Sequence, residues 1–355
     1  MRSLIDILDL SVEELDELIR TALEIIDDPA RFSQRCRGRQ LAALFFEPST
    51  RTRLSFESAM LALGGQVLSV TGAGGSSLAK GESIADTAKV VSCYADIIAM
   101  RHPQEGAALV AAENASIPVI NAGDGGHCHP TQTLADLLTI YREQGRFTGL
   151  TVGICGDLKY GRTVHSLIGA MSRYEGTRFV LISPPELAVP DYVRTALRER
   201  GIPFTETASL EQALPELDIL YMTRIQRERF DDLALYEALK DSYVLTQEKM
   251  QAAKADMCVL HPLPRVNEIS VAVDRDPRAC YFRQAYNGKI MRMALILKLL
   301  SETEERQDGR RYVRHLRCRN ARCISQTEQE LPQAFYEVPG EGIFRCRYCD
   351  QEGRG

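Results

Sequence analysis

The chain lacks an excess of positive charge, a membrane-length apolar segment and an internal repeat. Its 355 residues carry 43 Lys and Arg against 48 Asp and Glu, a net charge of −5 that gives no reason to expect a nucleic-acid partner. The long uncharged stretch at residues 58–79 is broken by glycines and hydroxyl side chains, which argues against a membrane span. Acidic residues among the first thirty argue against a secretory leader. We therefore expect a cytoplasmic protein with no nucleic-acid or membrane partner.

Strand-like and helix-like segments alternate along most of the chain, which predicts α/β architecture with parallel sheets. A capping box at Ser11 and Glu14 predicts a helix to about residue 26. Strands are expected near 41–46, 66–70, 96–101, 118–122, 151–156, 179–183, 218–223 and 257–260. Helices are expected at 52–63, 84–94, 105–115, 131–144, 162–174, 190–200, 231–240 and 247–254. This number of strand–helix units is too large for one compact sheet. We therefore expect two doubly wound parallel-sheet lobes joined by helices.

Residues 46–53, with the sequence FEPSTRTR, have the features of a phosphate-binding helix start. The apolar run 41–46 predicts a buried strand, Pro48 ends it, and Ser49 is a suitable N-cap for the segment that follows. Free backbone amides, the helix dipole, hydroxyls and two guanidiniums all favour a bound dianion. An ordinary capped helix with solvated arginines is the alternative.

Five predicted strands end in polar or cationic residues, most of them framed by Gly or Pro. These ends are MRHP (100–103), NAGDGGHCHPTQ (121–132), GDLKYGRTVHS (156–166), MTRIQ (222–226) and HPLPR (261–265). Ligand sites of open α/β sheets lie at the carboxyl ends of strands. The arginines there predict substrates rich in anionic oxygens.

Four of the ten cysteines cluster near the C-terminus as Cys318-x4-Cys323 and Cys346-x2-Cys349. Two such pairs predict a tetrahedral Zn²⁺ site, and four thiolates with no open position indicate a structural one, with one ion per chain. A disulfide pair or a redox motif is the alternative. The other six cysteines are scattered, and we expect them to be reduced.

Seven strings in order along residues 1–306 resemble the catalytic chains of aspartate carbamoyltransferases: FFEPSTRTRLSFESAMLALGG, SSLAKGE, MRHPQEG, NAGDG..HPTQTL, GDLKYGRTVHSL, MTRIQ.ER and HPLPR. The resemblance implies transfer of a carbamoyl group from carbamoyl phosphate to L-aspartate in pyrimidine (UMP) biosynthesis, with no cofactor in catalysis. The cysteine segment resembles the zinc domain of the regulatory chain of that family. The chain thus resembles a catalytic chain fused to a truncated regulatory chain.

The resemblance also implies roles for individual residues. The catalytic residues would be Arg51, Thr52, Lys80, Arg101 and His129. Carbamoyl phosphate would be bound by Ser49, Thr50, Arg51, Thr52, Ser76, Arg101, His129, Gln132 and the carbonyls of Pro262 and Leu263, with Ser77 an alternative to Ser76. Aspartate would be bound by Lys80, Arg162, Arg224 and Gln226. The metal ligands would be Cys318, Cys323, Cys346 and Cys349.

Domain boundaries and assembly are expectations of the same kind. We expect a carbamoyl phosphate lobe at 1–131 completed by a helix at 287–306, an aspartate lobe at 132–286, a linker at 307–314 and a small zinc-binding β domain at 315–355. In the family the loop that carries Ser76 and Lys80 reaches a neighbouring subunit, which implies a homotrimer with shared active sites. Joining of two trimers through the zinc domain is left open.

Two other functions are alternatives to aspartate carbamoyl transfer. Ornithine carbamoyltransferases share the STRTR and HPTQ motifs, but their amino-acid side resembles DxxxSMG and HCLP. Arg224 here suits an anionic side chain and opposes the ammonium of ornithine. A non-catalytic zinc scaffold would have lost matched positions, and none is lost.

Overall fold

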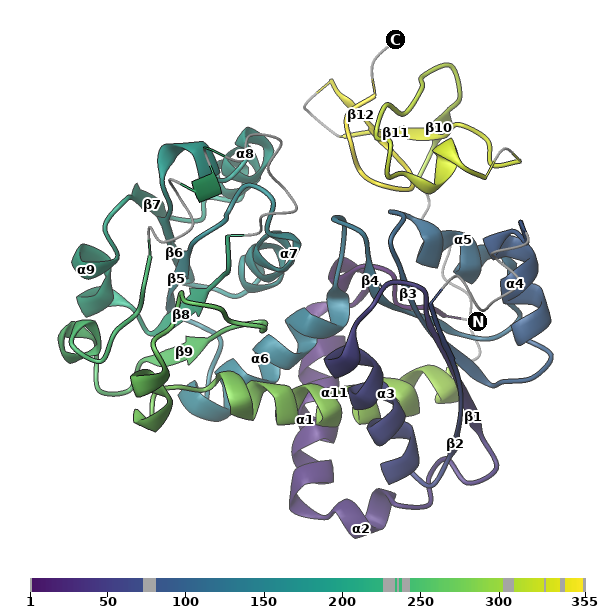
Figure 1. The fold of residues 1–355 in the computed structure, drawn as a ribbon, viewed down its shortest axis with the longest axis horizontal. Helices are drawn as coiled ribbons and strands as arrows, with labels where there is room; N and C mark the ends of the chain where they lie inside the picture. The colour runs from purple at the N-terminus through teal and green to yellow at the C-terminus, as the bar shows by residue number, and fades with distance from the viewer. Residues whose placement is uncertain are drawn as a thin grey trace. The chain divides into compact units, whose positions relative to one another are not determined.

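The computed structural model describes residues 2–72, 81–225, 234, 236–237, 243–302, 310–328, 330–338 and 342–353. They form two compact units (Figure 1). The first unit comprises residues 1–131 and 289–355, and the second comprises residues 132–288. The predicted segment 231–240 lies mostly outside the described residues. No described helix is both long and apolar enough to cross a membrane.

The first unit is built on a four-stranded parallel sheet in the order β2-β1-β3-β4. Its strands are β1 (Gln40–Phe45), β2 (Gln66–Thr71), β3 (Ile97–His102) and β4 (Val119–Asp124). The two central strands and β4 are almost wholly buried, as the continuous apolar runs predict. All four carboxyl ends therefore meet at one edge, which carries the first half of the site.

Helices cover both faces of this sheet. They are α1 (Val12–Asp27), α2 (Pro29–Phe32), α3 (Thr50–Ala62), α4 (Ile84–Val91) and α5 (Ala107–Asn114). Apolar side chains of α4 and α5 pack on β1 and β3 in one cluster, while α3 lies on the other face (Figure 1). Two long helices, α6 (Pro130–Gln144) and α11 (Tyr281–Ser301), each contribute residues to both units.

The C-terminal part of the first unit is a small β domain, which we call the metal module (residues 310–353). Its antiparallel sheet has the order β10-β11-β12, with β10 (Tyr312–Val313), β11 (Phe335–Glu337) and β12 (Phe344–Cys346). β10 begins inside the segment expected to be a linker. Apolar residues of the module join the cluster formed by α4 and α5, so the module shares a core with the first sheet.

The second unit has a five-stranded parallel sheet in the order β7-β6-β5-β8-β9. Its strands are β5 (Thr151–Cys155), β6 (Arg178–Ile182), β7 (Phe204–Thr207), β8 (Ile219–Met222) and β9 (Cys258–Leu260). Its further helices are α7 (Arg162–Met171), α8 (Asp191–Glu199) and α9 (Leu210–Ala213), with α7 and α9 on opposite faces (Figure 1). The predicted fold class is confirmed.

One expectation for local structure was wrong, and one strand was not predicted. The segment 247–254 forms only a 3-10 turn at Lys249–Ala252, because the backbone is already extended at Ala253. β7 was missed, since this short edge strand has the half-exposed sequence FTET and no apolar run. The capping box at Ser11 and Glu14 is confirmed.

Candidate active site and metal cluster

The predicted phosphate-binding helix start at residues 46–53, which we call the cradle, lies directly after β1 and opens α3, as predicted. Ser49 occupies the N-cap position, but its side chain makes no capping hydrogen bond, which differs from the simple capped-helix interpretation. The amides of the first turn of α3 therefore lack that side-chain acceptor, and the positive end of the helix dipole is directed to the same place. Thr52 is buried in this first turn, whereas Arg51 is exposed.

Arg101 brings a second guanidinium to this edge of the sheet. It lies in β3, is 8% exposed, and places Nη2 2.6 Å from Oε2 of Glu47. Its Nη1 donates to the carbonyl of Ala122 at 3.3 Å. Burial lowers the pKa of Arg101, and the charge of Arg51 acts in the same direction, which means that the two cations are close. Two neighbouring, partly desolvated guanidiniums are suited to an anion with more than one negative charge.

Gly123 in β4 allows Arg101 and His129 to lie side by side. Its φ is +117°, and a Cβ atom there would lie 2.6 Å from Nη1 of Arg101 and 3.5 Å from Cδ2 of His129. Any side chain would therefore be both strained and in collision with the guanidinium. His129 is 6% exposed, so the structure brings both predicted residues to one buried place.

The loop before His129 is organised by the fully buried carboxylate of Asp124. It accepts hydrogen bonds from the amides of Gly106 at 2.9 Å and Cys128 at 3.0 Å. The side chain of Asn121 donates to it at 3.0 Å, and Nδ1 of His127 lies 3.1 Å away. Burial would raise the pKa of Asp124, but His127 and these hydrogen bonds lower it. The loop is thus held by a charged hub that sequence reasoning did not identify.

In the second unit, the ends of β5 and β8 are tied together. Oγ1 of Thr223 donates to the carbonyl of Cys155 at 3.1 Å and accepts from the amide of Asp157 at 3.0 Å. Gly156 permits this approach, because a Cβ there would lie 2.4 Å from the Thr223 carbonyl oxygen. Arg162 begins α7 after β5, and Arg224 directly follows Thr223. Both predicted aspartate-binding arginines therefore lie on loops with a common rigid base.

The loop after β9 carries Pro262 and Leu263. The amide of Leu263 donates to Nδ1 of His261 at 2.7 Å, and Nε2 of His261 lies 2.8 Å from Glu268. Leu263 has φ of +53°, which is uncommon for a non-glycine residue and costs on the order of 1 kcal/mol. Such conformations concentrate at functional sites.

Three predicted residues, Ser76, Lys80 and Gln226, lie outside the described residues, as does the alternative Ser77. Four residues near the site were not singled out from the sequence: Glu47, Gly123, Asp124 and Asp136. The first three lie inside the recognised motifs, so their position next to predicted site residues could have indicated them.

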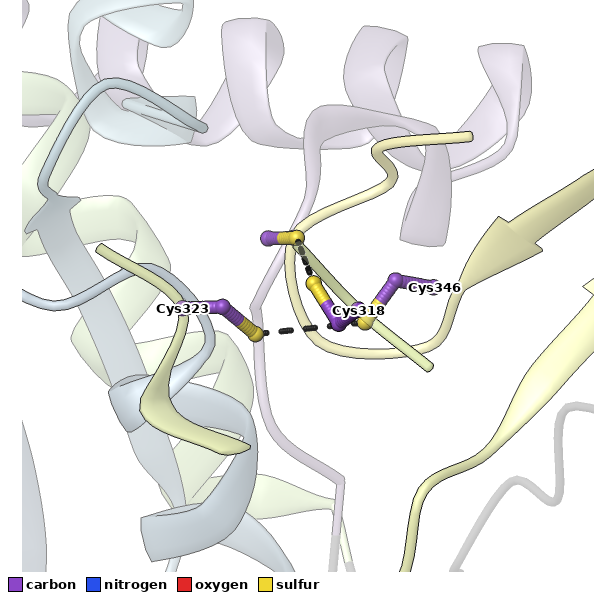
Figure 2. Close-up of side chains that lie close together, drawn as sticks. Cys318, Cys323 and Cys346 are labelled. Carbon is purple, nitrogen blue, oxygen red and sulfur yellow. Dashed lines mark hydrogen bonds between the residues drawn. The ribbon is translucent and has the colours of Figure 1, made fainter. Parts of the chain in front are cut away.

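The four clustered cysteines converge in the metal module. Their sulfurs all lie within 4.8 Å of one another, and all four residues are buried. Figure 2 shows Cys318, Cys323 and Cys346 with their sulfurs directed inward. Sulfurs of Cys318 and Cys349 are 3.5 Å apart, and those of Cys323 and Cys346 are 3.9 Å apart. None is in a disulfide.

The donor set fits a cation. Hydrogen bonds with the neighbouring thiols lower the pKa of Cys318, while those with Cys318 and Cys323 raise the pKa of Cys346 and Cys349. Without a cation, four adjacent thiolates would repel one another, so few of the four sulfurs can be negatively charged. A divalent ion removes this repulsion by binding all four thiolates.

Three protein-family models match the chain. Residues 2–142 match "Aspartate/ornithine carbamoyltransferase, carbamoyl-P binding domain", and residues 148–299 match "Aspartate/ornithine carbamoyltransferase, Asp/Orn binding domain". Residues 312–354 match "Aspartate carbamoyltransferase regulatory chain, metal binding domain". The aspartate carbamoyltransferase catalytic subunit of Clostridium novyi is 62% identical over 299 residues, which cover 84% of this chain and 98% of the relative. The chain belongs to the aspartate carbamoyltransferase family.

Solved structures agree with this assignment. The catalytic subunit of M. jannaschii aspartate transcarbamoylase has a TM-score of 0.80 and 47% identity, with 84% of this chain and 98% of that chain covered. Aspartate transcarbamoylase from Trypanosoma cruzi in complex with N-(phosphonacetyl)-L-aspartic acid (PALA) has a TM-score of 0.79 and 38% identity, with coverage of 84% and 96%. The family predicted from the sequence is confirmed, and the non-catalytic scaffold has no support.

Proposed function

We propose that the chain transfers the carbamoyl group of carbamoyl phosphate to the α-amine of L-aspartate, giving N-carbamoyl-L-aspartate and phosphate for pyrimidine biosynthesis. The observation that carries this proposal is that the buried Arg101 of β3 lies close to Arg51 at the start of α3. The chain is also 62% identical to an aspartate carbamoyltransferase catalytic subunit. The Trypanosoma cruzi relative has been solved with carbamoyl phosphate and aspartate together.

On the carbamoyl phosphate side, Ser49, Thr50, Arg51 and Thr52 hold the phosphate. Thr52, Arg101 and His129 donate to the carbonyl oxygen, which becomes more negative in the tetrahedral transition state. Donors fixed in a buried site favour that state over the ground state. The Gly123 contact and the Asp124 hub keep Arg101 and His129 fixed before substrate binds. The amine of aspartate then attacks the carbonyl carbon, the bond between that carbon and the phosphate oxygen breaks, and the departing phosphate, held by Arg51, takes the proton that the amine loses.

The –NH₂ group of carbamoyl phosphate is held by acceptors: Oε1 of Gln132 and the carbonyls of Pro262 and Leu263. Arg162 and Arg224, with Gln226 and Lys80, bind the aspartate carboxylates, a task for which planar guanidinium groups are suited. These groups orient substrates and stabilise charge, so the proposed reaction uses no cofactor.

We infer that the cysteine cluster holds one Zn²⁺ per chain. Four sulfur ligands fill a tetrahedral ion and leave no position for substrate, so the ion is structural. A module of about forty residues builds too small a core to fold alone, and the metal supplies the missing stability.

The proposed assembly is a cytoplasmic homotrimer. Leu54 and Leu61 of α3 are 52% and 60% exposed, and seven residues apart they lie on one face. Leu68 and Val70 on the edge strand β2 are 42% and 36% exposed, and a Ser69–Glu57 hydrogen bond of 2.7 Å links β2 to α3. Such an apolar face beside a sheet edge supports a subunit contact. In that assembly Ser76 and Lys80 complete a neighbour's site, and the zinc domain is available to join two trimers.

The two halves of the proposed site have different tests. Arg51→Ala should weaken carbamoyl phosphate binding and lower turnover by about 10²–10³-fold, as for loss of a donor to a developing charge. Arg224→Ala should raise the KM for aspartate and leave the Kd for carbamoyl phosphate unchanged. Loss of carbamoyl phosphate binding in Arg224→Ala would contradict the assignment of the halves.

A further inference from the structure

Asp136 in α6 is a buried carboxylate that accepts from two glutamine amides. It is 0% exposed, and its Oδ1 accepts from Nε2 of Gln132 at 2.8 Å and from Nε2 of Gln284 at 2.5 Å. Burial and the nearby Asp136 raise the pKa of the Tyr221 hydroxyl well above its ordinary value, which places a third polar group beside this carboxylate.

The direction of these hydrogen bonds is set by the backbone. The amide N–H of His261 can only donate, and it donates to Oε1 of Gln284 at 3.0 Å. The other end of that amide, Nε2, must therefore face Asp136. A carboxylate is an acceptor only, so the amide of Gln132 must also present Nε2 to it. Donors from both glutamines therefore converge on Asp136, and the orientation of Gln284 is fixed by a backbone group that cannot reverse.

The hydrogen bond to Asp136 determines which polar atom of the Gln132 amide faces away from Asp136. With Nε2 bound to the carboxylate, the remaining polar atom of the amide is Oε1, an acceptor. A glutamine turned the other way would present –NH₂, a donor, which repels another –NH₂ group. A glutamine amide has no strong preference of its own between the two orientations.

We propose that Asp136 is a positioning residue that locks the amide of Gln132 with its oxygen toward the substrate, so that the site selects a carbamoyl –NH₂ group over the methyl group of an acyl phosphate. This inference rests on the proposed function, in which Gln132 binds that group. Asp136 touches no substrate atom itself.

The same chain of hydrogen bonds positions the second set of acceptors. Gln284 holds the amide of His261, and Nδ1 of His261 accepts from the amide of Leu263 at 2.7 Å. The carbonyls of Pro262 and Leu263 lie in that stretch of backbone. Asp136 therefore connects Gln132 with the loop whose carbonyls are proposed to accept from the same –NH₂ group.

The discriminating variant is Asp136→Asn. It keeps the size of the side chain but adds a donor, so the amide of Gln132 is free to turn. Sites that read a hydrogen-bonding group lose selectivity when their own polar groups are mismatched. We expect kcat/KM for carbamoyl phosphate to fall about 10–100-fold, at roughly 1.4 kcal/mol per tenfold. The Kd of PALA, which has no group equivalent to the carbamoyl –NH₂, should change less than about 3-fold, as should the inhibition constant of acetyl phosphate.

A matched control is Thr139→Val in the same helix. Oγ1 of Thr139 is buried and accepts from Nδ2 of Asn287 at 2.9 Å, so this variant also removes a buried bond between α6 and α11. It should lower the Tm without changing the ratio of carbamoyl phosphate to acetyl phosphate affinity. If Asp136→Asn lowers binding of PALA and carbamoyl phosphate equally, Asp136 is merely structural and the proposal is overturned.

A second variant tests the idea independently of the stability of Asp136→Asn. Gln132→Met leaves Asp136 and Gln284 in place and should lose the same selectivity for –NH₂ over methyl. Unchanged selectivity in Gln132→Met would overturn the proposal. Failure of the wild-type enzyme to bind PALA at all would instead contradict the proposed function, so the two failures are distinguishable.

Discussion

Nε2 of His127 lies 2.9 Å from Oδ2 of Asp350, so the residue after the cysteine Cys349 contacts a side chain two positions before His129. The other ring nitrogen of His127 faces Asp124, the hub of the same loop. Nearby, Glu105 accepts from the side chain of Asn320 at 2.5 Å, and its amide donates to the carbonyl of Arg322 at 2.9 Å. The metal module therefore contacts the loop that holds His129 in the proposed carbamoyl phosphate site.

Loss of the metal should destabilise the first unit beyond the module itself. Cys349→Ser removes one of the four proposed ligands and should lower the zinc content and the Tm, because the core that the module shares with α4 and α5 is destabilised. Turnover at low temperature should survive, since the ion has no open coordination position. Cys93→Ser, at an exposed cysteine, is the control. An unchanged Tm in zinc-free Cys349→Ser protein would refute a structural role.

Gly123→Ala tests the fixed position of Arg101. The added Cβ would lie 2.6 Å from Nη1, so the guanidinium must move, and we expect kcat/KM to fall about 10²-fold. Gly145→Ala is the matched control: its φ is +69°, so the backbone strain is similar, but nothing lies within 4 Å of the added atom. Steady-state kinetics and Tm of both variants separate the two effects. Equal kinetic losses would mean that the contact with Arg101 is unimportant.

The residues of this site were predictable mainly where they follow a strand. The cradle after β1 and the ends of β3 and β4 came from apolar runs that stop at Pro, Gly or charge, and the structure places Arg101 and His129 together there. Asp136 and Gln284 could not be found this way, because their roles depend on a contact between residues 148 positions apart. The resemblance implied a β fold for the metal module, and this is confirmed, but the positions of its strands were not predicted, since a ligand set rather than an apolar period determines that fold.

His102 should make the folded protein sensitive to acid. Burial lowers the pKa of His102 to about 4, whereas in the unfolded chain it is about 6.5. Between these values the unfolded chain binds the extra proton, so stability falls as pH decreases from about 6.5 to about 4, by up to about 3 kcal/mol. His102→Asn, which can still accept from the amide of Gln104, should flatten this part of the profile. Unfolding by urea at several pH values measures it, and an unchanged slope would show that other groups cause the acid sensitivity.

Leu61→Asp should weaken the proposed subunit contact. Placing a charge on the exposed apolar face of α3 opposes burial of that face between subunits, so the mass in solution should fall toward that of a monomer. Leu8→Asp replaces another leucine that is more than half exposed and should leave the mass unchanged. Light scattering measures the mass in solution of both variants and shows whether the face of α3 forms the subunit contact. A trimer that persists in Leu61→Asp would place the contact elsewhere.

The most direct test of the central claim is carbamoyl transfer assayed with L-aspartate and L-ornithine side by side, on protein of known zinc content and mass. Arg224 and the similarity to aspartate carbamoyltransferases predict N-carbamoyl-L-aspartate as the product, with kcat/KM for aspartate exceeding that for ornithine by at least about 10³-fold, since an unpaired like charge in the site is strongly rejected. Comparable rates with ornithine, or no transfer to aspartate by zinc-loaded protein, would contradict the account.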